Sequence, residues 1–470
     1  MANRVKGKRG VSRRKLLKES VAAAALAGLW APTSTALQQA PAVITRRRFR
    51  AWISRGEGPG RTTLQEATLR PIAGRQVVVR TEATNLCYSN STAVLGQTPN
   101  PGTPAAPPSV LAAPAGTRRM NDMAVIQGHG GVGIVEAVGP EVRRVKVGDR
   151  VCVSGTPQCG SCYRCVRGRA DMCQFLSAIG ADDLEAIADL NDGTPVFENS
   201  HIGGLAELMV TTEEWIVPLF TGASAVDLGM VCSCVTVAGL GASLSPSLAP
   251  VEPASAVAVV GCGPLGLSAV QGARIAGANT IIAIDPVRAR RDLAQRVGAT
   301  QVLDPNVDPG NVFLRVRELT TWQTDRLWSG GRNPAGRRPG AGADFVIEAA
   351  GAELFPPRVE RGSDPTGIQP MQQAYQMCAL GGHVITTSLV RGNISLPGTL
   401  FSIGGVTHHG GQAGGASPLR DIPRFVHLME TGQFDAKALS TLVVPFEKML
   451  EGYEQAAYRT TITAIMTFGA

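Results

Sequence analysis

The 470-residue sequence has almost no net charge once its first 36 residues are set aside. Those residues hold eight of the 45 lysines and arginines and one of the 37 acidic residues, so the rest carries 37 basic and 36 acidic side chains. A nucleic-acid-binding surface needs an excess of basic residues, and we therefore expect no nucleic-acid partner. The sequence also has no apolar run long enough to span a bilayer and no internal repeat. Its length suits two to four globular domains.

The first 36 residues have the three parts of an export signal. A basic stretch ends in Arg13-Arg14-Lys15, a mild apolar run extends from Val21 to Trp30, and Ser34-Thr35-Ala36 forms a small-residue cleavage site. The arrangement resembles a twin-arginine export signal, which implies the twin-arginine machinery as a partner and a periplasmic or otherwise exported mature protein. The alternative is a disordered basic arm before a chance alanine-rich segment.

Residues 255–285 predict a strand–helix–strand unit. Ala256–Val260 and Ile281–Ile284 are short apolar runs typical of strands buried on both faces, and an apolar helical pattern that stops at Gly277 lies between them. Three glycines follow the first strand. Gly261 suits a tight turn, Gly263 a close approach of backbone to a pyrophosphate, and Gly266 the packing of helix on strand.

Asp285 ends the second of these strands, 24 residues after Gly261, where a carboxylate can accept hydrogen bonds from ribose hydroxyls. A 2′-phosphate would be repelled there, so the pattern predicts a site for NAD in preference to NADP. The basic residues just downstream, Arg288, Arg290 and Arg291, argue against this preference, because positive charges attract a 2′-phosphate. The alternative to a dinucleotide site is an ordinary glycine-rich turn.

Four cysteines lie within fifteen residues, at Cys159, Cys162, Cys165 and Cys173. Four thiolates at this spacing can close a tetrahedral structural zinc site. An exported protein could instead form two disulfides from them. We favour zinc, because twin-arginine substrates fold before they cross the membrane and can take up metal in the reducing cytoplasm.

This loop, the G-H-x-x-x-G-x-V-E-x-V-G run before it, the G-D-R-V bridge and the later nucleotide unit resemble, in this order, the zinc-dependent medium-chain alcohol dehydrogenases. The resemblance implies an α/β fold in which a doubly wound Rossmann domain is inserted into a mostly β GroES-like catalytic domain. We expect a signal peptide at residues 1–36, catalytic segments at 37–236 and 405–470, and the Rossmann domain at 237–404.

The same resemblance implies a second, catalytic zinc held by Cys87, His129 and a cysteine of the run 231–241. The family pattern selects Cys234, with Cys232 as the fallback. Two cysteines and one imidazole leave a fourth position open, where zinc can polarise an alcohol or aldehyde oxygen. Ser89 would pass the substrate proton, and Leu265 would pack behind the nicotinamide.

Several family positions are altered. Asn90 and Gly130 stand where the family has carboxylates, which lowers the basicity of the ligands. Thr92 replaces a relay histidine and cannot act as a base near neutral pH. Tyr88 and Thr463 stand at positions where other members have basic phosphate contacts. Gly155 replaces a bulky pocket residue and either serves a turn or widens the pocket.

Other segments carry weaker signals. Insertions are expected at residues 95–116, 321–342 and 353–367, the second containing Trp322 and Trp328, which normally pack in a loop but could cap the cleft or bind a partner. We interpret His408-His409 as part of a solvated loop, because no third metal ligand is visible nearby. A helix is expected from Pro423 to Gly432, and a strand and helix between Leu439 and Gly452.

The sequence therefore predicts an exported, NAD-dependent alcohol dehydrogenase with one catalytic and one structural zinc, acting on a small alcohol or aldehyde as a homo-oligomer. A redox partner is possible if the nucleotide stays bound outside the cytoplasm. Two alternatives remain at this point: a zinc-free double-bond reductase of the same fold, and a catalytically idle NAD-binding protein with structural zinc only. Two zinc ions per chain fit the dehydrogenase, whereas one fits either alternative.

Overall fold

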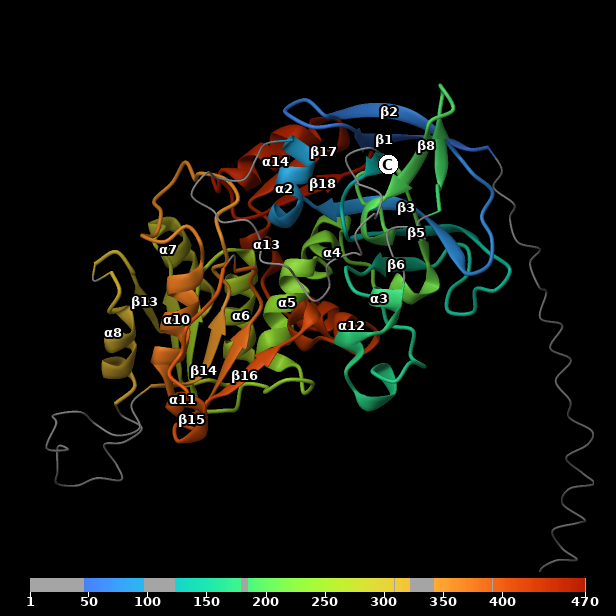
Figure 1. Ribbon diagram of the computed structural model, residues 1–470. Coiled ribbons are helices and arrows are strands. Elements are labelled where there is room, and N and C mark those ends of the chain that lie inside the picture. Colours follow the sequence, from blue (N-terminus) through green and yellow to red (C-terminus); the bar gives the residue numbers. More distant parts are fainter. Residues whose placement is uncertain are drawn as a thin grey trace, which may run out of the picture. The chain divides into compact units, whose positions relative to one another are not determined.

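The computed structural model describes residues 46–96, 123–178, 185–307, 309–321, 342–390 and 392–469 (Figure 1). The predicted export signal, Trp322, Trp328 and most of the first two predicted insertions lie outside these residues. Among the described residues no single helix is long and apolar enough to cross a membrane. Helices α4 (Ala225–Val231) and α5 (Cys234–Leu244) pass that test only as a pair with a 51° bend between them.

The first domain consists of a small barrel and a larger sheet. The barrel has the closed order β1 (Arg48–Ser54), β2 (Thr62–Leu69), β7 (Ala188–Leu190), β8 (Pro195–Glu198) and β4 (Ala124–Ile126). The sheet has the order β10 (Ile216–Pro218), β6 (Arg150–Val153), β5 (Gly131–Val138), β3 (Gln76–Asn85), β18 (Ala464–Thr467) and β17 (Leu442–Pro445), and β9 (Leu208–Thr212) also pairs with β3. Since β17 and β18 come from the C-terminal end of the chain, the second domain is an insertion into the first.

The second domain is built on a six-stranded parallel sheet. Its order is β13 (Gln301–Leu303), β12 (Thr280–Ile284), β11 (Ala256–Val260), β14 (Ala343–Glu348), β15 (Cys378–Thr386) and β16 (Thr407–Gly410). The chain starts in the middle of the sheet and winds outward in both directions, so the crevice between β11 and β14 is the topological switch point where such sheets bind ligands.

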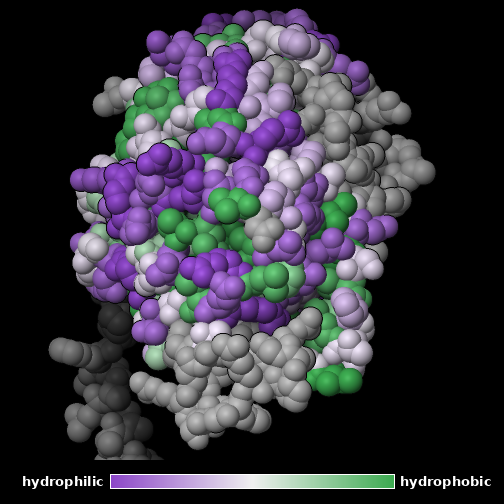
Figure 2. Space-filling model, turned by 90° about the vertical axis from the view of Figure 1, so that its left-hand side faces the viewer, coloured by the Kyte–Doolittle hydropathy of each residue, from purple (hydrophilic) through white to green (hydrophobic). Residues whose placement is uncertain are grey.

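Helices cover both faces of this sheet. Successive side chains of a strand point to opposite faces, and both sets are apolar in a strand such as β11, so both faces must be buried. Val257 and Val259 pack with α6 (Pro264–Ile275), α7 (Arg288–Val297) and α5 in one core, whereas Ala258 and Val260 pack with α8 (Val312–Leu319) and α10 (Ile368–Met377) in another. The outward side of α7 is polar, and that of α8 carries Arg315 and Glu318 beside the exposed Leu314; the face that Figure 2 shows is mostly hydrophilic with small apolar areas.

The remaining helices and turns connect the two domains and complete them. The helices are α2 (Ser91–Leu95), α3 (Phe175–Ala178), α11 (Thr399–Ser402), α12 (Pro418–Glu430), α13 (Ala436–Leu439) and α14 (Met449–Ala457). The 3-10 turns are η2 (Tyr88–Asn90), η4 (Cys165–Arg167), η5 (Ala170–Met172), η7 (Asn199–His201), η8 (Glu213–Trp215), η9 (Gln412–Gly415) and η10 (Phe446–Lys448).

Three expectations need correction. The helix expected from Pro423 begins at Pro418, and Pro423 lies inside it. His408 and His409 lie on strand β16 and not in a loop. This strand is the sixth of the parallel sheet, so the Rossmann domain extends beyond the boundary expected at residue 404. A third imidazole is also close, because His383 Nδ1 lies 3.0 Å from His409 Nε2.

Candidate active site

Three side chains from distant parts of the chain meet in the cleft. Cys87 precedes turn η2, His129 precedes strand β5, and Cys234 is the first residue of α5, which Ser233 caps by accepting a hydrogen bond from the Thr236 N–H. The metal-ligand atoms of Cys87, His129 and Cys234 all lie within 4.8 Å of one another. Cys232 is buried nearby and is not part of this cluster.

The side chains around this cluster fix its orientation. His129 Nδ1 hydrogen-bonds to Asn90 Oδ1, and because an amide oxygen only accepts, the proton sits on Nδ1 and the Nε2 lone pair faces the cysteines. His129 Nε2 lies 3.2 Å from Cys234 Sγ, which lies 3.3 Å from Cys87 Sγ. Asn90 thus keeps the orienting role of the family carboxylate, without its charge.

The donor set fits a zinc ion. Tetrahedral ligands with zinc–sulfur bonds of about 2.3 Å stand about 3.8 Å apart, and those with zinc–nitrogen bonds stand slightly closer. The observed 3.2–3.3 Å separations are within about half an ångström of these values. A hydrogen bond from Cys234 outweighs the opposing effect of burial and holds the pKa of Cys87 well below that of an ordinary thiol, so the group is disposed to the thiolate form that binds metal.

Ser89 stands at the mouth of this cluster. Its hydroxyl lies 3.2 Å from Cys87 Sγ and 3.4 Å from His129 Nε2, and its side chain is exposed to the cavity. Gly155 lies against the cluster, because a Cβ added there would stand 3.0 Å from the His129 carbonyl oxygen and 3.5 Å from Cys234 Cβ. Gly155 therefore borders the space where a substrate would approach the ligands.

A second cluster of possible metal ligands lies in the four-cysteine loop and consists of Cys159, Cys162, Cys165 and Cys173. Cys159 Sγ lies 4.0 Å from Cys165 Sγ, and Cys162 Sγ lies 3.9 Å from Cys173 Sγ. These separations match the edges of a zinc tetrahedron, about 3.8 Å, and exceed the disulfide bond length of about 2.05 Å. All ten cysteines are free, so the disulfide alternative is not realised in this structure.

Backbone amides around the loop turn towards the sulfurs. Cys162 Sγ accepts hydrogen bonds from the N–H groups of Cys165, at 3.5 Å, and Gln174, at 3.4 Å. Burial raises the pKa of the Cys162 thiol, but these donors outweigh it and lower the pKa to about 6. The pKa of Cys159 is also lowered, whereas burial raises the pKa of Cys165 and of Cys173, so the loop favours the thiolate at two of its four positions.

The glycine loop after β11 is shaped for an anion. Gly261 has φ +92°, and a Cβ there would stand 2.8 Å from the backbone nitrogen of Ala350. A Cβ on Gly266 would stand 1.8 Å from the Gly261 oxygen, so the close packing of α6 on β11 requires glycine. At Gly263, the N-cap of α6, the nearest group to an added Cβ is Arg290 Nη1 at 4.0 Å. The open space therefore lies before the helix N-terminus, where a phosphate binds best.

Asp285 lies at the end of β12, beside this loop. Its Oδ2 accepts a hydrogen bond from the Cys262 N–H at 2.7 Å and its Oδ1 one from the Val287 N–H at 2.8 Å, which leaves further lone pairs facing the cavity. Of the three downstream arginines only Arg290 lines the cavity among the described residues. Arg291 is engaged by Asp304, and Arg288 is exposed.

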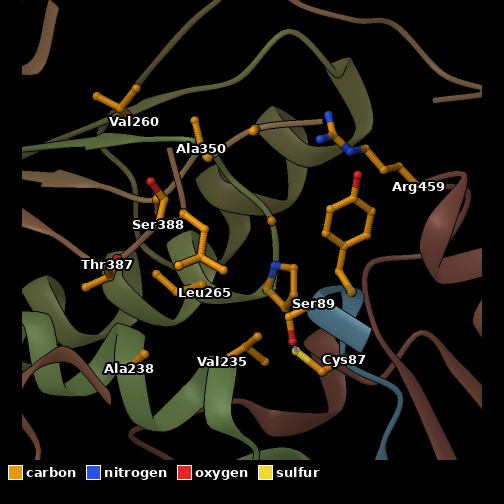
Figure 3. Close-up of a pocket in the computed structure, with 18 of the residues that line it drawn as sticks. Cys87, Ser89, Val235, Ala238, Val260, Leu265, Ala350, Thr387, Ser388 and Arg459 are labelled. Atoms are coloured by element: carbon orange, nitrogen blue, oxygen red, sulfur yellow. Dashed lines mark hydrogen bonds between the residues drawn. The ribbon is translucent and has the colours of Figure 1, made fainter. Parts of the chain in front are cut away.

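One cavity of about 520 Å³ joins the three-residue cluster to the glycine loop. In Figure 3, Cys87 and Ser89 lie at the lower end of this cavity, Leu265 lies in its middle, and Arg459 reaches across its upper end. Val235 and Ala238 of α5 form an apolar wall beside Leu265. The Thr463 hydroxyl is buried at this cavity without a hydrogen-bond partner among the described residues, as a group awaiting a polar ligand would be.

Sequence reasoning missed two charged groups here. Glu348, fully buried at the end of β14, accepts hydrogen bonds from the N–H groups of Ala350 and Gly351 and from the Ser388 hydroxyl, while burial raises its pKa. The sequence signal that could have identified Glu348 is an acidic residue at the end of a buried apolar strand. Arg459 lies four residues before Thr463, and no sequence motif marks it.

Comparisons with known proteins agree with this architecture. A family model described as "Alcohol dehydrogenase GroES-like domain" matches residues 73–221, and one described as "Zinc-binding dehydrogenase" matches residues 264–430. Among curated proteins, a class-3 alcohol dehydrogenase of Cereibacter sphaeroides is 23% identical over 86% of this chain and 96% of its own length. An NDMA-dependent alcohol dehydrogenase of Amycolatopsis methanolica is 28% identical over 74% of this chain and 85% of its own.

Solved structures show the same fold. An alcohol dehydrogenase zinc-binding domain protein from Burkholderia ambifaria superimposes with a TM-score of 0.72 at 24% identity, covering 90% of this chain and all of the other. Benzyl alcohol dehydrogenase from Acinetobacter calcoaceticus gives 0.68 at 22% identity with the same coverage. These matches confirm the predicted fold, a Rossmann domain inserted into a GroES-like catalytic domain.

Proposed function

Because the chain belongs to the medium-chain dehydrogenase family, in which a GroES-like domain is joined to a zinc-binding dehydrogenase domain, we propose that it transfers a hydride between an alcohol or aldehyde and NAD in a zinc-dependent reaction. The family makes it an oxidoreductase. The observation that carries the finer proposal is that Cys87, His129 and Cys234 converge in the same cavity as the glycine loop and Asp285.

The protein's own residues divide the work at the substrate end. Zinc, when bound by Cys87, His129 and Cys234, supplies a Lewis acid that polarises the substrate oxygen. The Ser89 hydroxyl can take the proton from that oxygen. It lies 3.4 Å from His129 Nε2 and therefore next to the position where the three ligands would hold zinc and its bound substrate. Thr92 lines the same cavity and cannot serve as a base, so the proton passes on to water.

The other end of the cavity holds the nucleotide. NAD, when bound, supplies the carbon that accepts or gives the hydride. The amides at the N-terminus of α6 hold the diphosphate, and Asp285 accepts hydrogen bonds from the ribose. Leu265 lies between the two ends, where it would pack behind the nicotinamide and keep the ring next to the substrate. The apolar wall at Val235 and Ala238 favours an apolar alcohol.

The test of this proposal is a pair of cysteine variants. Cys234→Ser should lose one of two zinc ions per chain and abolish turnover of alcohols, while NADH binding and the second zinc remain. Cys232→Ser is the matched control, two residues away, and should keep both zinc ions and turnover. If Cys232→Ser is the inactive variant, the ligand assignment is wrong. A wild-type chain that holds one zinc contradicts the dehydrogenase and favours a zinc-free reductase or an idle NAD-binding protein.

We also propose that the chain is exported by the twin-arginine machinery as a folded homo-oligomer with nucleotide already bound. The support is the Arg13-Arg14 leader together with the scarcity of free NAD outside the cytoplasm. A nucleotide that stays bound must be recycled in place, either by a second carbonyl substrate or by a redox partner. Nucleotide found in denatured protein purified from the exported fraction supports this. Protein that arrives empty contradicts it.

A further inference from the structure

The segment between β14 and α10 leaves the Rossmann domain and packs against the catalytic domain. Its Phe355 is 1% exposed and belongs to the catalytic-domain core that includes Val94 and Tyr453. The Phe355 ring also meets the Tyr458 ring edge-on, at 6.0 Å between centroids. An aromatic side chain of one domain is therefore buried in the core of the other.

Hydrogen bonds fix the same segment to the catalytic domain. The Tyr88 hydroxyl accepts from the N–H of Leu354 at 2.8 Å and from that of Phe355 at 3.2 Å. The Arg358 N–H donates to the Tyr458 carbonyl at 2.9 Å, and the Arg358 guanidinium lies 3.8 Å from the Tyr458 ring centroid. Tyr88, which stands where relatives have a basic phosphate contact, has here become an anchor for this segment.

An ion-pair network completes the junction. Glu353 is 5% exposed and pairs with Arg361 of its own segment at 2.9 Å and with Arg459 of the catalytic domain at 3.3 Å. Arg459 has a φ of +60°, which a non-glycine residue rarely adopts, and its guanidinium lies 5.5 Å from the Tyr88 ring centroid. This left-handed residue follows the end of α14, where the Arg459 N–H donates to the Ala456 carbonyl at 3.2 Å, and its side chain reaches Glu353 and the Tyr88 ring.

The residues of this junction are also walls of the nucleotide cavity. Tyr88, Glu353, Leu354 and Arg459 line it together with the glycine loop, and Figure 3 shows Arg459 among the lining side chains. Any opening of the cleft by separation of the two domains must therefore expose Phe355 and break the Tyr88 hydrogen bonds and the Glu353–Arg459 pair. These costs fall on nucleotide exchange, and Tyr88 links the junction to the substrate end, because Cys87 and Ser89 flank it in the sequence.

We propose that residues 353–361 form a clasp that locks the two domains together across the nucleotide cavity and retains NAD as a resident group, with Arg459 as the cation facing the nucleotide. The proposal rests on the proposed nucleotide site and deepens it. The clasp also compensates for the missing basic phosphate contacts at Tyr88 and Thr463, because the closed junction itself then retains the nucleotide.

The test compares two buried aromatic residues of the same core. The mature protein, complete from residue 37 onward, is loaded with NADH. The release rate of NADH is followed as loss of nucleotide fluorescence after mixing with excess NAD. Phe355→Ala should speed release about a hundredfold, the factor that corresponds to deleting a buried aromatic contact from the closed state. Phe49→Ala, in β1 and 3% exposed, removes an aromatic residue from that core without crossing the cleft, and should lower the melting temperature with release within about twofold of wild type.

Tyr88→Phe provides a second variant in case Phe355→Ala does not fold. It keeps the ring and deletes the acceptor of two backbone N–H groups, and should speed release about tenfold with zinc content unchanged. Equal acceleration by Phe355→Ala and Phe49→Ala, unchanged release in Phe355→Ala and Tyr88→Phe, or a wild-type chain that does not bind NADH would overturn the clasp. Because release is measured without turnover, a chain that retains NADH but oxidises no alcohol refutes the proposed reaction and not the clasp.

Discussion

Replacing Asp285 by asparagine should shift nucleotide preference from NADH towards NADPH. The carboxylate is 4% exposed at the end of β12, lines the nucleotide cavity and accepts hydrogen bonds from the Cys262 and Val287 N–H groups. Alanine would leave both donors unsatisfied, at about 1–3 kcal/mol each, and would disturb the loop itself. Asparagine keeps one acceptor oxygen and the side-chain shape and removes the charge, so it is the sharper perturbation.

The magnitude follows from the lost interactions. A hydrogen bond from a ribose hydroxyl to a charged acceptor contributes about 1.5–3 kcal/mol, so NADH should bind about ten- to a hundredfold more weakly to Asp285→Asn. NADPH should bind more tightly than to wild type, because its 2′-phosphate no longer faces a carboxylate and Arg290, which lines the same cavity, can pair with it. Arg288 and Arg291 contribute less, since one is exposed and the other is paired with Asp304.

The assay is a fluorescence titration of both reduced nucleotides, with zinc content and melting temperature recorded for each protein. Asp344→Asn is the matched control, because it neutralises another carboxylate of the same sheet that accepts a backbone N–H, from Ala256, and does not line the cavity. It should leave the preference unchanged. Equal binding of NADH and NADPH by wild type, or an equal change of the ratio in Asp285→Asn and Asp344→Asn, would refute this prediction.

Three further substitutions probe the four-cysteine loop, the substrate end of the cavity and the glycine loop. Cys165→Ser should cost one zinc ion and lower the melting temperature, because structural zinc contributes folding free energy directly; intact zinc and unchanged melting contradict this. Gly155→Phe should depress kcat/KM for bulky alcohols more than for small ones, since the added side chain starts 3.0 Å from the His129 oxygen; an unchanged substrate profile would mean that the glycine serves only the turn. Gly266→Ala should abolish NADH binding with both zinc ions retained, because its Cβ would stand 1.8 Å from the Gly261 oxygen; wild-type NADH affinity would disprove the packing role.

The sequence was most informative where structure is local. The strand Ala256–Val260 was predicted to the residue, and the second strand begins at Thr280, one residue earlier than expected. Both are apolar runs bounded by glycines or an acidic residue, and a parallel strand buried on both faces requires such a run. Gly261 makes a turn with φ +92° and Gly266 lets α6 pack closely on β11, as predicted, whereas the phosphate role of Gly263 stays a prediction.

Helix and strand ends that depend on distant partners were not predictable. Pro418 and Pro423 both suit the first turn of a helix, and only the packing of α12 against the core identifies Pro418 as the start. His408 and His409 form a strand because β15, more than twenty residues earlier, pairs with them in parallel. The clasp depends on contacts between residues 266 positions apart, such as Tyr88 and Leu354, and on the positive φ of Arg459, which no motif encodes.

The most direct test of the account is the isotope content of the reduced nucleotide. Zinc-loaded protein is mixed with NAD and a panel of aliphatic and aromatic alcohols deuterated at the carbinol carbon, and the nucleotide is isolated and weighed by mass spectrometry. We expect NADH that carries one deuterium at the nicotinamide from the wild-type protein, and no deuterated NADH from Cys234→Ser. Reduced nucleotide without deuterium, or no reduced nucleotide from any alcohol in a protein that holds two zinc ions, would contradict it.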